Sequence, residues 1–260
     1  MIKLICSDLD GTLIRYGDKG VRPELYGLVR RLSQKGILFC PASGRQFTSQ
    51  AAQFAPVKEH CIFICENGAV VFGKNGALLG KTVMPRSAAE EIAEDFWNRS
   101  DGRGEVMLSG ENTAYLMSRG LGMEDRIRFI GNNYKLIRSP AEIPEDITKV
   151  SVFIGTGCAP YAERFVSRWS GMNAAVAGPF WIDTMAADKG TGVRTICKAL
   201  DIRPEEVMAF GDNWNDVPML DAVGMPYIMS SACGELLERY PNHASSPEEV
   251  IARFLDETER

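Results

Sequence analysis

The N-terminal segment contains the feature that most restricts what this chain can fold into. Residues 2–13 read Ile-Lys-Leu-Ile-Cys-Ser-Asp-Leu-Asp-Gly-Thr-Leu, an apolar run that stops at two carboxylates one residue apart. The run predicts a buried strand that delivers Asp8 and Asp10 to the end of a sheet, where the glycine lets the chain turn. Two clustered anions repel each other unless a cation lies between them, and Mg²⁺ is the hard ion that oxygen ligands favour. Taken alone, the segment fits a strand followed by an ordinary Asp-Gly turn equally well.

Length and charge narrow the class of protein. A chain of 260 residues can bury a large core, in one big domain or two unequal ones. The formal net charge of -5 disfavours a general nucleic-acid or anionic-membrane binder. Asp8 and Asp10 interrupt the only apolar run near the N-terminus, so we expect no secretory signal, and no apolar stretch is long enough to span a bilayer. We therefore expect a soluble, cytoplasmic protein with no membrane or nucleic-acid partner.

The cysteines indicate reduced thiols rather than a disulfide framework. Their number, seven, is odd, and most of them stand in apolar runs. Cys61 and Cys65 have a spacing that could suggest zinc, but they lie in Cys-Ile-Phe-Ile-Cys, which is typical of a strand. No second pair or nearby histidine completes four ligands, so the sequence favours buried thiols over zinc.

The N-terminal third alternates strand and helix. Between residues 22 and 36 apolar side chains recur at helical spacing, with Pro23 at the start and Gly36 at the end. Residues 37–40 and 61–65 are predicted strands, each followed by polar residues and glycine. This βαβ pattern implies a parallel sheet, and ligands of such sheets collect beyond the carboxyl ends of the strands.

The pattern changes after about residue 82. Ser87-Ala-Ala-Glu90 is a capping-box signature, and an apolar stripe over residues 92–97 predicts the helix that follows it. Further segments read as strands at 105–108, 113–117, 149–155 and 174–183, with a helix at 161–169. This mixed order predicts an α+β insert with an antiparallel sheet that folds as a second domain.

Alternation of helix and strand returns at residue 188. Helices are predicted around 193–200, 217–223 and 247–256, and strands at 206–211 and 227–229. The sheet domain is thus expected to comprise residues 1–82 and 183–260, with residues 83–182 inserted in it. The predicted fold class is α/β, a doubly wound parallel sheet with an inserted α+β domain.

Four polar clusters stand at predicted strand ends or helix starts of the split domain. They are Asp8-Leu-Asp10-Gly-Thr12, Ser43-Gly44-Arg45, Lys189, and Gly211-Asp212-Asn-Trp-Asn215-Asp216. Each is weak alone, and Ser-Gly-Arg is usually a simple turn, but polar side chains directly after an apolar strand have no packing role. Together they fit a phosphoryl-transfer site, where carboxylates hold Mg²⁺, a lysine and a hydroxyl bind phosphoryl oxygens, and a free carboxylate attacks phosphorus.

These motifs resemble those of the haloacid dehalogenase (HAD) superfamily of phosphatases. Asp-x-Asp-Gly-Thr, Ser-Gly-Arg, Asp-Lys-Gly and Gly-Asp-x-x-Asn-Asp match its four motifs in order and spacing. The insert, and Glu66-Asn67-Gly68-Ala69 after the third strand, look like its Cof-type (class IIB) branch. The resemblance covers nearly the whole chain and implies a Rossmann-like core with a C2B-type cap domain, which would exclude water and select the leaving group.

The resemblance implies a role for each motif residue. Asp8 would be the nucleophile that forms an aspartyl-phosphate, and Asp10 would protonate the leaving oxygen and then deprotonate the hydrolytic water. Mg²⁺ would be bound by the Asp8 carboxylate, the Asp10 backbone carbonyl and Asp212. Asp216 would not bind the ion directly but would orient Lys189 or a metal-bound water. Phosphate oxygens would be held by the remaining groups: the Leu9 and Gly44 backbones, Ser43, Lys189 and Asn215. Arg45 and Asn67 could face the substrate or could simply brace loops.

The acidic residue at position 10 favours complete hydrolysis. The resemblance implies that a non-acidic residue at this position would suit members of the family that stop at the phosphoenzyme or lack phosphatase action. We expect a Mg²⁺-dependent phosphatase of small phosphorylated metabolites, with sugar phosphates as the first candidates. One alternative is a phosphotransferase or mutase similar to phosphomannomutase. The other is a catalytically idle phosphate-binding protein, against which the intact set of carboxylates and lysine argues.

Two regions are less informative. The family often has Gly-Asn-Ala after its fourth motif, whereas residues 228–233 here read Ile-Met-Ser-Ser-Ala-Cys. We expect this departure to affect peripheral packing or substrate fit rather than phosphoryl chemistry. In the insert, Arg119, Phe180 and Trp181 are candidates for touching substrate, although aromatic side chains there more often form the core. Nothing in the sequence marks an oligomeric interface.

Overall fold

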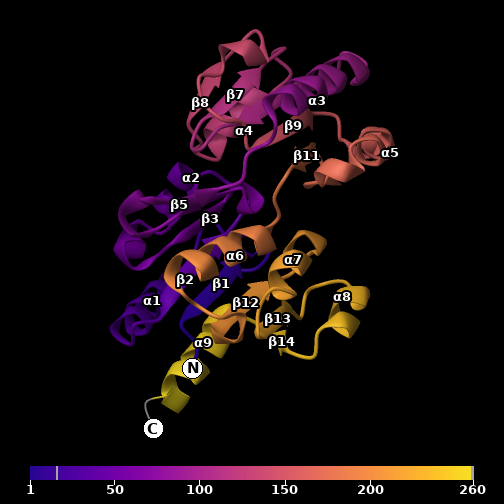
Figure 1. Cartoon of the computed structure of the whole chain (residues 1–260). Helices are drawn as coiled ribbons and strands as arrows, with labels where there is room; N and C mark the ends of the chain where they lie inside the picture. The colour runs from indigo at the N-terminus through magenta and orange to yellow at the C-terminus, as the bar shows by residue number, and fades with distance from the viewer. Residues whose placement is uncertain (16, 259–260) are drawn as a thin grey trace. The chain divides into compact units, whose positions relative to one another are not determined.

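The computed structural model describes residues 1–15 and 17–258, which fold into two compact units (Figure 1). Unit 1 comprises Met1–Gly80 and the chain from Asp188 onwards, and unit 2 comprises Lys81–Ala187. The sequence pattern placed the two crossings near residues 82 and 183. The chain therefore leaves unit 1 once, builds all of unit 2, and returns.

Unit 1 is built on an eight-stranded sheet with the order β14-β13-β12-β1-β2-β3-β4-β5. The strands from β14 to β3 run parallel, and β4 pairs antiparallel with β3. Their bounds are β1 (Leu4–Asp8), β2 (Leu38–Ala42), β3 (Phe63–Cys65), β4 (Val70–Phe72), β5 (Leu78–Lys81), β12 (Val207–Gly211), β13 (Met225–Met229) and β14 (His243–Ala244).

The apolar N-terminal run forms the centre of this sheet. All five residues of β1 are buried, as expected of a parallel strand covered on both faces. Leu4 pairs in register with Val207 of β12 and with Leu38 of β2. The register brings the carboxyl ends of β1, β12 and β2 to the same edge of the sheet, and the motif residues follow there.

Helices cover both faces of the unit 1 sheet (Figure 1). On one face Val193 and Ile196 of α6 pack against Leu4 and Cys6 in a shared apolar core. On the other face α1 contacts α9. The helices are α1 (Pro23–Gln34), α2 (Phe47–Gln53), α6 (Lys189–Leu200), α7 (Val217–Leu220), α8 (Gly234–Arg239) and α9 (Pro247–Thr258). The fold is a doubly wound α/β sheet, as the sequence pattern predicted.

Unit 2 is an α+β domain with a six-stranded sheet in the order β10-β11-β9-β6-β7-β8. Neighbouring strands are antiparallel except β7 and β8, which are parallel. The strands are β6 (Gly104–Ser109), β7 (Ala114–Met117), β8 (Tyr134–Leu136), β9 (Lys149–Ile154), β10 (Ala175–Val176) and β11 (Trp181–Met185); the helices are α3 (Arg86–Arg99), α4 (Met123–Phe129) and α5 (Ala159–Arg168). Phe96 of α3 and Phe165 of α5 pack on one face of the sheet, while Met123 and Ile127 of α4 belong to a second, smaller core.

One local prediction in unit 2 was wrong. Helix α3 begins at Arg86 after Pro85, and no side chain caps it, so Ser87 lies inside the helix and its capping box does not form. With Ser87 as the N-cap the helix would begin at Ala88, but Pro85 takes the N-cap position and the helix begins two residues earlier. The restricted φ angle of proline is compatible with the start of a helix. The strand-like sequence predicted over 174–183 is confirmed; it forms a hairpin of β10 and β11, whose connection includes Gly178 at φ +107°.

The described residues contain neither a disulfide bond nor a membrane-spanning helix. All seven cysteines lie within the described residues and are free thiols; Cys65 ends β3, and Cys61 pairs with Phe39 in an isolated bridge before it. Within residues 1–15 and 17–258, no helix has the length and apolar character needed to cross a membrane.

Candidate active site

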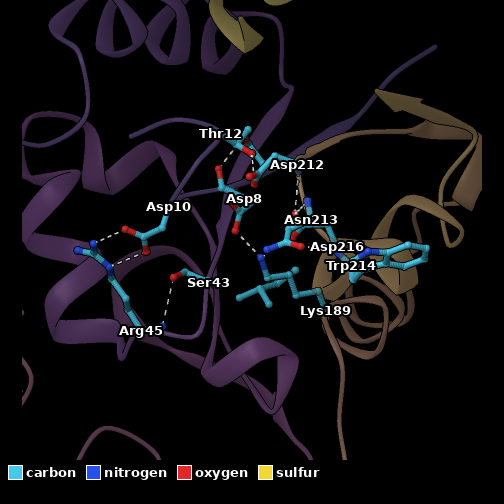
Figure 2. A network of polar contacts seen from close by, with 12 residues as sticks. Asp8, Asp10, Thr12, Ser43, Arg45, Lys189, Asp212, Asn213, Trp214 and Asp216 are labelled. Carbon is cyan, nitrogen blue, oxygen red and sulfur yellow. Dashed lines mark hydrogen bonds and ion pairs between the residues drawn. The ribbon is translucent and has the colours of Figure 1, made fainter. Parts of the chain in front are cut away.

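The motif side chains converge at the carboxyl edge of the unit 1 sheet (Figure 2). Asp8 is the last residue of β1, Asp212 directly follows β12, and Ser43 directly follows β2. Lys189 is the first residue of α6, whose start is fixed by Asp188: its side chain accepts a hydrogen bond of 2.6 Å from the Thr191 backbone N–H. The fold thus brings together residues that are more than two hundred positions apart in the chain, such as Asp8 and Asp216.

Lys189 links two carboxylates in the interior of this site. Its Nζ donates to Asp8 Oδ1 and, at 2.6 Å, to Asp216 Oδ1. Both Lys189 and Asp216 are buried. Burial by itself lowers the pKa of Lys189, but Asp216 and Asp8 raise it above its ordinary value, so the ammonium stays charged.

The carboxylates outnumber the cations. Asp8, Asp212 and Asp216 each offer an oxygen, and these oxygens lie within 4.8 Å of one another. Burial, reinforced by Asp216, raises the pKa of Asp8 well above its usual range, and burial also raises the pKa of Asp212. Among the described residues, the buried Asp8 Oδ2 has no hydrogen-bond partner. A single ammonium leaves this cluster negative, so the donor set fits a hard divalent cation with oxygen ligands.

The loop after β12 is braced by Asp216. Its Oδ2 accepts the backbone N–H groups of Asp212 (2.9 Å) and Asn213 (3.1 Å), while its Oδ1 accepts from Lys189. Asn213 in turn accepts from the Trp214 N–H at the start of a short 3₁₀ turn, Trp214–Asp216. The role expected for Asp216, orienting Lys189 from behind, corresponds to a contact that is present in the structure.

Thr12 makes a contact that sequence reasoning did not anticipate. Its buried hydroxyl donates to Asp212 Oδ1 at 3.1 Å, so it orients a candidate metal ligand (Figure 2). Gly11 allows this approach, because it has φ +108° and a Cβ there would collide with the Asp212 carboxylate. Thr12 belongs to the first motif, but only the tertiary contact identifies its partner.

Asp10 has its side chain turned away from the cluster and toward Arg45 (Figure 2). Arg45 Nε donates to Asp10 Oδ2 at 2.9 Å, and Arg45 Nη2 donates to Asp10 Oδ1. Asp10 is half-exposed, whereas Asp8 two residues earlier is buried. Asp8 and Asp10 are therefore aimed in different directions, and the metal contact expected of Asp10 involves its backbone carbonyl alone.

The remaining predicted residues lie around this centre. Leu9 and Ser43 are buried, and the Ser43 Oγ accepts the backbone N–H of Arg45 at 3.2 Å. Gly44 lies against Asn67, whose side-chain amide would be 3.1 Å from a Cβ at position 44. Asn67 itself has φ +52°, and Asn215 is exposed on the 3₁₀ turn after Asp212.

The residues that the sequence suggested for substrate contact in the insert have partners within unit 2. Arg119 lies over the Trp97 ring at 3.5 Å from its centroid and donates to the Trp97 carbonyl oxygen. Trp181 packs against Phe153 with ring centroids 4.8 Å apart, and Phe180 is partly exposed beside them. These contacts are those of a domain core and its rim.

Comparison with known proteins identifies the family. A family model described as haloacid dehalogenase-like hydrolase matches residues 5–255 of this chain. The chain belongs to this family. The resemblance inferred from the four motifs is thus confirmed.

Relatives of this HAD-like hydrolase are phosphatases. The 5-amino-6-(5-phospho-D-ribitylamino)uracil phosphatase YbjI of Escherichia coli (strain K12) is 24% identical over 243 residues, 89% of this chain and 86% of the relative. The HMP-PP phosphatase of Serratia proteamaculans (strain 568) is 24% identical over 254 residues, 93% of this chain and 88% of the relative. The solved structure of the HAD subclass IIB sugar phosphatase BT4131 is similar in fold, with a TM-score of 0.78 at 18% identity, covering 97% of this chain and 98% of that one.

Together these findings define the enzyme class. The chain is a HAD-superfamily phosphatase, a hydrolase of phosphoric monoesters, and its inserted α+β unit is consistent with the class IIB cap.

Proposed function

We propose that this HAD hydrolase is a Mg²⁺-dependent phosphatase that cleaves small phosphorylated metabolites through an aspartyl-phosphate on Asp8. The observation that carries the proposal is the buried Asp8 carboxylate. One of its oxygens accepts from Lys189, whereas the other has no hydrogen-bond partner among the described residues. A carboxylate that is held in place and has a free oxygen can act as a nucleophile toward phosphorus.

The proposed reaction has two steps. In the first, an Asp8 oxygen forms a bond to phosphorus while the bond from phosphorus to the leaving oxygen breaks, and Asp10 gives its proton to that leaving oxygen. In the second, a water oxygen attacks the same phosphorus, Asp10 takes the proton from the water, and the Asp8–phosphorus bond breaks. Free phosphate and the original Asp8 carboxylate result.

Charge on the phosphoryl group has to be neutralised during both steps. Lys189 is a buried cation beside Asp8, and we infer that it binds phosphoryl oxygens with Ser43, Asn215 and the backbones of Leu9 and Gly44. Asp8, Asp212 and the Asp10 carbonyl would hold Mg²⁺. Asp216 would not bind the ion directly but would orient Lys189 or a metal-bound water. When bound, the ion supplies positive charge that stabilises the phosphoryl oxygens.

The substrate class is inferred from the relatives. Their names include a phosphorylated ribityl compound, HMP-PP and sugar phosphates. We propose sugar and polyol phosphates, including those joined to a small ring, as substrates in the cytoplasm. Asn67, which lies against Gly44 at the rim of the site, is the proposed substrate contact from unit 1.

Phosphate release is the measurement that tests this function. The protein is incubated with hexose 6-phosphates, pentitol phosphates and pyrimidine-linked phosphates, in Mg²⁺ and in excess chelator, without an added acceptor. We expect release in Mg²⁺ only, and a fall of about a thousandfold or more in Asp8→Asn, because the amide has nearly the volume of the carboxylate but is a far weaker nucleophile.

A matched variant separates chemistry from folding. Asp221→Asn alters a carboxylate that pairs with Arg239 outside the site, and it should retain wild-type release. Near-normal activity in Asp8→Asn would exclude the covalent mechanism. Transfer of phosphate to an alcohol acceptor, with no release in water, would instead favour a phosphotransferase.

A further inference from the structure

Arg45 and Asp10 form a close ion pair at the edge of the site. Arg45 presents two N–H donors, Nε and Nη2, one to each oxygen of the Asp10 carboxylate (Figure 2). Such a two-pronged contact fixes both the position and the plane of a carboxylate, which a single donor cannot do. About a fifth of the Arg45 side chain is exposed and about half of the Asp10 side chain, at 21% and 52%.

Arg45 is itself firmly anchored. Its backbone N–H donates to Ser43 Oγ at 3.2 Å, and its carbonyl oxygen accepts from the Glu66 backbone N–H and from Gln50 Nε2, both at 3.2 Å. Gln50 also donates to the carbonyl of Ile64 next to the end of β3, at 2.9 Å. The backbone from which the Arg45 guanidinium extends is therefore fixed at the sheet edge, whereas Asp10 lies in the turn that follows β1.

The contacts of Arg45 also indicate which role it does not have. Its Nε and Nη2 donors are both taken up by the Asp10 carboxylate, whose side chain extends away from the Asp8, Lys189 and Asp216 cluster (Figure 2). From the sequence, Arg45 could bind phosphate or substrate, or could simply brace a loop. A guanidinium already engaged by a carboxylate on two prongs has given up the donors best suited to that role.

We propose that Arg45 is a positioning residue for Asp10, which holds the carboxylate beside the site in a defined orientation, and that it is not a phosphate- or substrate-binding residue. Asp10 accepts from Arg45 on both oxygens while no leaving group is bound. During turnover one oxygen keeps its contact with Arg45, and the other carries the proton that passes to the leaving oxygen and is afterwards taken back from the water. A carboxylate has more lone pairs than the two that Arg45 occupies, so a further partner fits without loss of the whole pair. The inference rests on the proposed phosphatase function and on the proton transfers assigned to Asp10.

A double-mutant cycle separates positioning from binding. Arg45→Gln, Asp10→Asn and the double variant are compared on an alkyl phosphate in Mg²⁺, with kcat and KM measured separately. We expect Arg45→Gln alone to lower kcat about tenfold, since positioned proton transfer contributes about 10²- to 10⁴-fold, and to change KM by less than about twofold. In the Asp10→Asn background, the same substitution should change kcat by less than about twofold, because the proton transfer that Arg45 orients is already lost.

The leaving group provides a second readout. With p-nitrophenyl phosphate the leaving phenolate departs without a proton, so Arg45→Gln should lower kcat less than it does with the alkyl phosphate. Arg45→Lys keeps the charge but cannot form the fork, and should fall between wild type and Arg45→Gln. This conservative variant also serves if Arg45→Gln does not fold. Arg31→Gln, which removes an Arg–Asp pair on the surface with Asp256, is the control and should match wild type.

The outcomes are distinct. A rise in KM on Arg45→Gln that persists in the Asp10→Asn background would overturn the proposal and assign Arg45 to substrate binding. Equal losses of kcat in both backgrounds would show that Arg45 acts independently of Asp10, which also overturns it. If the wild-type protein releases no phosphate from any substrate, the proposed function fails instead.

Discussion

At the scale of single residues, short contacts decide which of many acidic side chains belong to the site. The chain has 34 Asp and Glu residues, but the described residues contain one group of three whose oxygens approach closely enough to hold an ion. Within it Asp216 accepts from Lys189 and two backbone N–H groups, and Asp212 accepts from Thr12. These contacts, rather than the count of carboxylates, define the proposed metal site.

A substitution at Thr12 tests whether these contacts affect binding of the metal ion. Thr12→Val keeps the shape of the buried side chain but removes the donor to Asp212. Because groups that orient a metal ligand typically change affinity about 10- to 100-fold, we expect Mg²⁺ to bind more weakly by that factor, with kcat at saturating Mg²⁺ close to wild type. The Mg²⁺ dependence of phosphate release, or calorimetric titration of Mg²⁺, measures it. The exposed hydroxyl of Ser170, changed to Ala, is the control, and an unchanged Mg²⁺ affinity in Thr12→Val would contradict the prediction.

At the scale of elements, helix starts and strand ends deliver the functional groups. Lys189 begins α6 because Asp188 caps the helix with a reciprocal contact to Thr191. In unit 2 a carboxylate also fixes local structure, since Glu105 on β6 accepts from the backbone N–H groups of Arg119 and Met123 at 2.7 and 2.8 Å. Glu105 thereby joins the segment after β7 to the start of α4.

Glu105 gives a prediction with a definite pH dependence. Burial raises its pKa, but the N–H groups of Met123 and Arg119 and the Ser118 hydroxyl outweigh burial, so its pKa lies below the ordinary value of 4.5. A lowered pKa contributes stability that is present above the pKa of the unfolded chain and is lost as pH falls through the folded value. We therefore expect Glu105→Gln to reduce the free energy of unfolding by about 1–2 kcal/mol at pH 7. The difference from wild type should shrink progressively below about pH 4.5.

Urea unfolding followed by tryptophan fluorescence suits this measurement, because three of the four tryptophans (Trp97, Trp169 and Trp181) lie in unit 2. Glu94→Gln, an exposed change on α3, is the matched control and should have little effect at either pH. A constant difference between Glu105→Gln and wild type from pH 7 to pH 3 would show that the charge of Glu105 does not matter.

At the scale of the whole molecule, an excess of negative charge at the active site lowers the stability of the folded chain. Three carboxylates face one ammonium, and burial raises the pKa of Asp8 and of Asp212. A cation that binds only the folded chain stabilises it by mass action. The proposed metal site should therefore be visible in stability as well as in catalysis.

Thermal unfolding with and without Mg²⁺ tests this without any substrate. We expect Mg²⁺ to raise the melting temperature of the wild-type protein, by the equivalent of about 2.7 kcal/mol at a concentration 100 times its Kd. Asp212→Asn should lose most of this gain, whereas Asp221→Asn should keep it. An equal gain in wild type and Asp212→Asn would show that Mg²⁺ stabilises the protein through another site.

The sequence by itself determined the fold class and most of the motif positions. A five-residue apolar strand ending in Asp8, the alternation of strand and helix around it, and a change of pattern in the insert were sufficient, because periodicity and strand ends are local properties of the chain. Several short elements were not predicted from the sequence. The strand β8 has three residues and β14 two, too few for a periodic signal, and a proline moved the start of α3.

The tertiary structure alone decided the partners. No local pattern predicts that Thr12 donates to Asp212, two hundred residues away, or that Arg45 pairs with Asp10 rather than pointing toward Lys189. Residue types and spacing define which groups reach the sheet edge. The direction of each side chain there depends on neighbours from other strands, because burial, charge and hydrogen bonding act between segments that only the fold brings together.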